Sequence, residues 1–204
     1  MFWRKSNITY DMLIPPLDKP FSQLSSAEAK EYFDWYIRNI PGRVEYLQAF
    51  SKIHLDISVD SLVPLWDWFL KNASVEKSPF SQNSALKKQL KHIPDDIARS
   101  VMIENSVQFS LQTEYILHDI AMYFGEVCVQ NNDAIYWGFH TDIKKDSFAN
   151  KPLLMGFCDR DFSPPFLPAF DPEFTVHNIA CNLLDGDAAK EDLRDMYNKW
   201  RRLM

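Results

Sequence analysis

Residues 108–131 read QFSLQTEYILHDIAMYFGEVCVQN, a long stretch with the apolar periodicity of an α-helix. Apolar side chains recur there at spacings that place them on one helical face, and further apolar residues widen this face. The residues concerned are Ile116, Leu117, Ile120, Tyr123, Phe124, Val127 and Cys128. Because they cover so much of the helix circumference, we predict a central helix that organises the fold.

Amphipathic segments elsewhere predict further helices over about 25–40, 43–54, 86–93, 173–184 and 187–200, and another that starts at an N-cap on Asp60. A brief helix over 95–104 is an open alternative. Ser25 and Glu28 have the spacing of a capping box. Pro41-Gly42 is expected to break the first of these segments from the second, which would give an antiparallel helical hairpin.

A small β-hairpin is predicted after the central helix. Residues 134–141 and 152–159 are short and rich in aromatic or apolar side chains, and the polar segment 142–151 separates them. The predicted fold class is therefore α+β, predominantly helical, with about six to seven helices and a small antiparallel β-hairpin or sheet near residues 134–159.

The chain of 204 residues is predicted to form a single domain. Its expected parts are an N-terminal arm (1–24), a helical part (25–131), the hairpin (134–159) and C-terminal helices (173–204). The arm is expected to pack on the body, because it contains Leu13, Ile14, Leu17 and Phe21.

The bulk composition favours a soluble cytoplasmic protein. A net charge of −6 argues against nucleic acid as a partner. No stretch approaches the length of about 18 apolar residues that membrane spanning needs, so no membrane partner is expected. The three cysteines lie in apolar segments without a C-x-x-C spacing, which is typical of buried free thiols in a reducing compartment. Only five glycines are present, and no phosphate-binding glycine loop, so we expect no cofactor.

The nearest approach to a catalytic cluster is Glu114, His118 and Asp119 on the central helix. Glu114 and His118 are four residues apart and share a face. Carboxylate-bridged metal sites use Glu-x-x-His from two helices, whereas this spacing is Glu-x-x-x-His. The prediction is therefore no catalytic or metal site, with these three residues as the candidates if an enzyme is present. The competing interpretation is a solvated or paired Glu–His.

Gly125 lies inside the central helix between bulky residues. A glycine there costs about 1 kcal/mol, so a close packing contact is predicted, most simply with the following hairpin. Its neighbour Glu126 is expected to reach backbone N–H groups or the indole of Trp137. These three residues are predicted to be structural.

Two segments are candidate binding surfaces. The first is the proline-rich stretch that contains Phe162, Phe166 and Phe170, which could present hydrophobic anchors. The alternative is that these aromatic side chains fold back onto the core. The second is the charged tip of the hairpin, with Lys144 and Lys145.

Residues 19–36, together with Tyr123–Val127 and Ile135–Phe139, resemble segments of uncharacterised small cytosolic proteins of Gram-positive bacteria. The second group, with its order of helix, Gly-Glu, strand and Trp, is also similar to several polymorphic-toxin immunity proteins. The resemblance covers about a third of the chain. It carries over no catalytic residue.

The leading functional hypothesis is a protein-binding module of the immunity-inhibitor type. An acidic face would engage a basic protein partner. One alternative is an enzyme of an unfamiliar class built on Glu114, His118 and Asp119. The other is a structural homo-oligomer.

Overall fold

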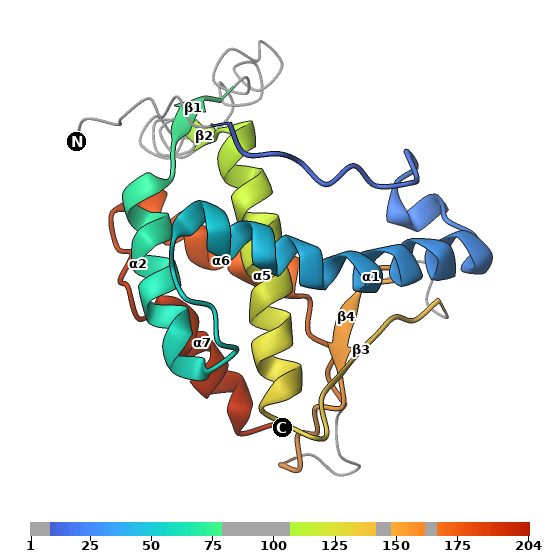
Figure 1. Ribbon diagram of the computed structural model, residues 1–204. Helices are drawn as coiled ribbons and strands as arrows, with labels where there is room; N and C mark the ends of the chain where they lie inside the picture. Colours follow the sequence, from blue (N-terminus) through green and yellow to red (C-terminus); the bar gives the residue numbers. More distant parts are fainter. Residues whose placement is uncertain (1–8, 79–106, 142–147, 162–166) are drawn as a thin grey trace, which may run out of the picture.

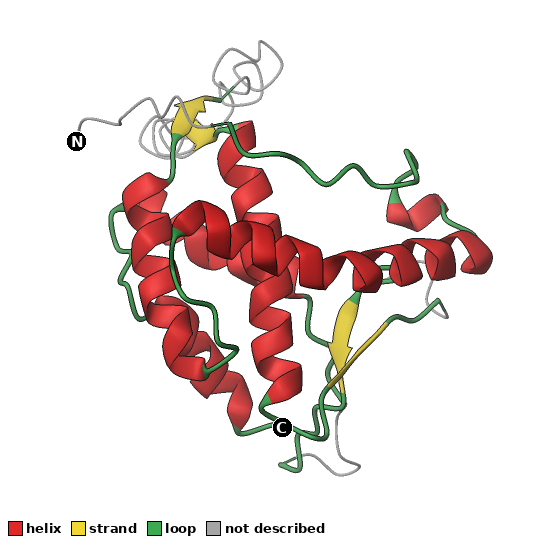
Figure 2. Ribbon diagram, in the orientation of Figure 1, coloured by secondary structure: helices red, strands yellow, loops and turns green. Residues whose placement is uncertain are grey.

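The structure is a computed structural model that describes residues 9–78, 107–141, 148–161 and 167–204. Within these ranges, five α-helices and two small antiparallel sheets form an α+β fold (Figures 1 and 2). The predicted fold class is confirmed, but the described residues contain fewer helices than the six to seven predicted. The helices predicted over 86–93 and 95–104 lie outside the described residues.

Helix α5 (Leu111–Gln130) is the central element of the fold. Twelve of its twenty residues are buried. In the view of Figure 1, α1 (Ser26–Ser51) crosses in front of α5, and α6 (Pro172–Asp185) passes behind it. Ser110 caps α5, since its side chain accepts a hydrogen bond from the Thr113 amide. The helix starts later than residue 108, because residues 107–109 belong to a strand.

Helix α1 runs without interruption through Pro41, so the predicted break and helical hairpin are wrong. A proline inside a helix removes one backbone hydrogen bond and costs about 3 kcal/mol. Buried side chains lie on both sides of it, Tyr36 and Ile40 before and Leu47 after. Packing of both halves therefore offsets the cost. The capping box of Ser25 and Glu28 is present as predicted.

The other helix ends differ in detail from the predictions. Helix α2 (Leu62–Asn72) follows the 3-10 turn η2 (Val59–Ser61), which Ser58 caps, so the predicted cap at Asp60 is wrong. Ser58 accepts the Ser61 amide, and this places Asp60 inside the turn. Gly186 ends α6 in the left-handed conformation. Helix α7 (Asp192–Arg201) then begins later than predicted.

The predicted hairpin is confirmed. Strands β3 (Tyr136–Gly138) and β4 (Leu153–Met155) pair antiparallel, with Trp137 opposite Leu154. A second sheet, not predicted, joins β1 (Val75–Lys77) to β2 (Val107–Phe109). It links the chain after α2 to the start of α5.

Several side chains of the described arm pack on the body. Tyr10 belongs to the main core, which extends through α5 to Tyr197 of α7. A smaller cluster joins Leu13, Leu17 and Phe21 of the arm to side chains of α1. Ile14 was expected to pack with them, but it is 78% exposed. None of the described helices combines the length and the apolar character needed to cross a membrane.

Candidate functional site

The interface between α5 and α6 carries the same sequence pattern on both helices. Glu114-x-x-x-His118 on α5 faces Glu173-x-x-x-His177 on α6. His118 Nδ1 lies 3.0 Å from Glu173 Oε1, and His177 Nε2 lies 3.3 Å from Glu114 Oε1. The two helices therefore exchange a glutamate and a histidine in two reciprocal pairs.

Asp119 takes part in a different contact. Its side chain is fully buried and forms a bidentate pair with Arg43 of α1, at 2.9 Å from Nε and 2.6 Å from the nearer terminal nitrogen. The Tyr10 hydroxyl donates to the same carboxylate. Burial raises the pKa of Asp119, and the hydrogen bonds from Arg43 and Tyr10 oppose this effect.

The three candidate catalytic residues are thus held in three separate pairs. Glu114 and His118 contact different residues of α6, and Asp119 points to α1 and the arm. Across the part of the chain that the structure describes, no three His, Cys, Asp or Glu side chains gather as metal ligands would.

Cys181 extends one of the pairs. Its Sγ lies 3.8 Å from His177 Nδ1, so Cys181, His177 and Glu114 form a row that resembles a nucleophile and its base. Burial, helped by the charges of Asp185 and Glu114, raises the pKa of the Cys181 thiol. A nucleophilic cysteine needs a lowered pKa. Because the pKa of the Cys181 thiol is raised instead, these three residues lack the electrostatic environment of a nucleophilic cysteine with its base.

The pair of His118 and Glu173 borders a small cleft, called here the aromatic cleft, with a volume of about 210 Å³. The N-terminal arm, α1, α5 and α6 all contribute to its walls. The lining residues are Met12, Leu13, Pro15, Tyr32, Trp35, Tyr115, His118 and Glu173.

Glu173 is the acidic group of this cleft. It lies in the first turn of α6, where the helix dipole favours a negative charge. Its Oε1 is buried and makes no hydrogen bond of good geometry within the described ranges, although His118 Nδ1 lies 3.0 Å from it and the Tyr36 hydroxyl also contacts the carboxylate. Burial raises the pKa of Glu173, but the contact with His118 outweighs it, so the pKa is lowered overall.

The pairing predicts a dependence of stability on pH. Burial lowers the pKa of His118, but the contact with Glu173 outweighs it, and the pKa is raised above 6.5. His118 therefore contributes stability that is complete below pH 6.5 and is lost as the pH rises through its folded pKa. The hydrogen bond that His177 donates to Glu114 likewise raises the pKa of His177. The lowered pKa of Glu173 contributes stability above pH 4.5 that is lost in stronger acid.

We expect urea denaturation to give a higher free energy of unfolding at pH 5.5 than at pH 8.5. His118→Gln should reduce this difference, because it removes one of the titrating groups. An equal difference in the wild type and in His118→Gln would contradict the role given to this pair.

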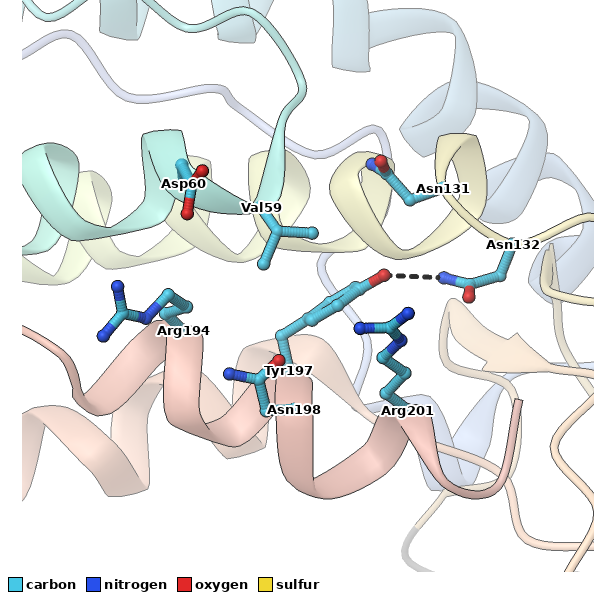
Figure 3. Close-up of a pocket in the computed structure, with 8 residues that line it drawn as sticks. All are labelled: Val59, Asp60, Asn131, Asn132, Arg194, Tyr197, Asn198 and Arg201. Carbon is cyan, nitrogen blue, oxygen red and sulfur yellow. Dashed lines mark hydrogen bonds between the residues drawn. The ribbon is translucent and has the colours of Figure 1, made fainter.

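A second cleft, called here the polar cleft, lies between α7 and the end of α5 (Figure 3). Its volume is about 520 Å³. The lining residues are Val59, Asp60, Asn131, Asn132, Arg194, Tyr197, Asn198 and Arg201. The Asn132 side-chain amide donates to the Tyr197 hydroxyl at 3.1 Å, which ties the two sides of the cleft together.

No protein-family model, curated protein or solved structure matches this chain.

Of the candidate binding residues, the structure describes only Phe170. Phe170 is 2% exposed and pairs with Leu154 next to the hairpin, so it packs in the core, as the alternative interpretation had it. Burial removes it from any exposed anchor surface. Phe162, Phe166, Lys144 and Lys145 lie outside the described residues.

Gly125 packs directly beneath the hairpin. A Cβ on Gly125 would lie 2.1 Å from the indole ring of Trp137. The indole Nε1 donates to Glu126 at 2.8 Å. The three residues form a tight joint between α5 and β3.

Several residues of the site were not predicted from the sequence. Arg43 and Tyr10 gave no signal, because they meet Asp119 from more than 70 positions away along the chain. The second Glu-x-x-x-His pattern, at Glu173 and His177, was visible in the sequence. It could have been compared with the first pattern, at Glu114 and His118. The two clefts depend on the packing of several elements and have no local pattern.

Proposed function

We propose that this protein is a protein-binding module of the immunity-inhibitor type that receives a lysine or arginine side chain of a basic partner in the aromatic cleft. One observation carries the proposal. The buried Oε1 of Glu173 makes no hydrogen bond of good geometry within the described residues, although His118 Nδ1 lies 3.0 Å from it, and aromatic side chains line the cleft beside it.

The lining suits a cationic side chain with a long apolar stem. Tyr32, Trp35 and Tyr115 offer ring surfaces to the stem and to the charge. A cation that reached Glu173 would add a well-aligned donor to a carboxylate that now has His118 beside it. A charge-assisted hydrogen bond of this kind contributes about 1.5–3 kcal/mol.

The surroundings of the cleft support a protein as the ligand. Met12 at its rim is 45% exposed, and Phe174, next to Glu173, is 57% exposed. Exposed apolar side chains around a charged centre are typical of protein interfaces. The net charge of −6 would also steer a basic partner toward the chain.

The enzyme alternative has less support. Each of Glu114, His118 and Asp119 is already engaged with a side chain of opposite charge from another element. A general acid or base must exchange protons with a substrate, whereas these contacts already occupy the three side chains.

Affinity capture with Glu173→Gln tests the proposal. Immobilised wild type should recover a basic protein from the lysate of the source cells at pH 8, where His118 competes less for Glu173, and added salt should release it. Glu173→Gln should recover about tenfold less, as for a central interface residue.

The matched control is Glu45→Gln, on the exposed face of α1. It removes the same charge and should recover as much partner as the wild type. Equal recovery with all three proteins, or recovery of an acidic partner only, would refute the proposal. Circular dichroism would check that both variants are folded.

A further inference from the structure

The polar cleft shares no lining residue with the aromatic cleft. Arg194 and Arg201 lie seven residues apart on α7, about 10 Å along the helix axis. They lie on either side of Tyr197, and Arg201 points from α7 toward Asn132, whereas the Arg194 guanidinium points away from Tyr197 (Figure 3). The two guanidinium groups therefore line one cleft on a chain that is acidic as a whole.

These arginines are largely free to bind a ligand. Within the described ranges, the Arg201 guanidinium has no hydrogen-bond or ion-pair partner. Arg194 reaches only Asp195, at 4.0 Å from its Nε. A guanidinium presents a planar set of donors that matches the oxygens of a carboxylate or a phosphate. The arginines thus favour an oxyanion.

The opposite side of the cleft offers acceptors. The Asn131 side-chain amide donates to the backbone carbonyls of Ile57 and Val127, both at 2.8 Å. The Asn132 amide donates to the Cys128 carbonyl and to Tyr197. Since these bonds occupy both amide nitrogens, the two Oδ1 atoms remain as acceptors, and Figure 3 shows Asn132 Oδ1 on the side of α7.

Asp60 sets a further requirement on the ligand. Its carboxylate lines the cleft together with the two arginines. A carboxylate accepts hydrogen bonds and repels a second anion, so the part of the ligand beside Asp60 should carry donors. The cleft therefore combines cationic donors with acceptors, and an anion without hydroxyl groups would use only the donors.

We propose that the polar cleft binds a small hydroxylated oxyanion, with Arg194 and Arg201 on the charged group and Asn131, Asn132 and Asp60 on the hydroxyl groups. The oxyanion is a phosphate ester or a carboxylate, which the arginines recognise by the same chemistry. A volume of about 520 Å³ is sufficient for such a molecule and lies in the usual range of ligand sites.

Nuclear magnetic resonance titration of the ¹⁵N-labelled protein tests this inference with four probes: ribose 5-phosphate, gluconate, inorganic phosphate and ribose. Ribose 5-phosphate, gluconate or both should give saturable shifts at the polar cleft, and the tighter of the two identifies the oxyanion. Arg201→Gln should weaken binding about tenfold, as expected for loss of a charge-assisted contact. The matched control Arg202→Gln, an exposed neighbour outside the lining, should bind within about twofold of the wild type.

Three results would overturn the inference. The first is the absence of saturable shifts with both hydroxylated anions. The second is binding of inorganic phosphate or ribose as tight as that of the hydroxylated anions. Such binding would show that the cleft does not require both the charged group and the hydroxyl groups. The third is an equal loss in Arg202→Gln, which would indicate non-specific attraction. Glu173→Gln should bind the probes like the wild type, so this test and that of the proposed function can fail separately.

Discussion

Replacing Asp119 with alanine should lower the free energy of unfolding by about 3–5 kcal/mol, the range for breaking a buried ion pair. The substitution leaves Arg43, 12% exposed, without its counter-charge, and Tyr10 without its acceptor. Both polar groups then lose the same carboxylate partner at once. Urea denaturation followed by circular dichroism measures the loss.

The matched control is Asp67→Ala, which removes the carboxylate of an exposed pair with Lys71 on α2. Pairs of this kind contribute about 0.3–0.5 kcal/mol, so the control should remain close to the wild type. The double variant Arg43→Met/Asp119→Leu should lose less than the sum of its single changes, since it leaves no isolated charge. A loss below about 1 kcal/mol for Asp119→Ala would contradict the burial and pairing described here.

Gly125→Ala should destabilise the protein by about 1–2 kcal/mol, although alanine is the better helix former. The added Cβ would lie 2.1 Å from the Trp137 ring, so the indole must move. Trp137 also donates to Glu126 and packs edge-on against Tyr36, with ring centroids 5.5 Å apart. Moving the ring disturbs both contacts. Thermal and urea denaturation would measure the effect.

Gly42→Ala on α1 is the control, because an added Cβ there meets no atom within 4 Å. It should stabilise the protein by about 0.5–1 kcal/mol through helix propensity alone. In a Trp137→Ala background, Gly125→Ala should also become stabilising. If it remains destabilising in that background, the collision with the indole is not the cause.

The sequence predicted best where a local pattern reports a local structure. The wide apolar face of 108–131 indicated a buried central helix, because only a helix surrounded by partners keeps so many apolar side chains. The placement of Gly125 between bulky residues indicated a close contact, since nothing else explains its cost in a helix. Both inferences use spacings within a few turns of one element.

The sequence predicted less where distant segments decide the outcome. Pro41 breaks a helix by its local chemistry, but burial of both halves of α1 keeps it continuous. Strand β1 has three residues, too few for an alternating pattern, and its partner begins 30 positions after it ends. For the site, Glu114, His118 and Asp119 were identified as one group, whereas packing gives each its own partner.

The reciprocal pairs between α5 and α6 also determine how far one helix can slide along the other. Because the two helices run antiparallel, a shift of one turn in one direction would place His118 against His177. A shift in the other direction would place Glu114 against Glu173. Either displaced arrangement opposes like groups at the interface, so two glutamates and two histidines suffice to make a single alignment of the helices the favourable one.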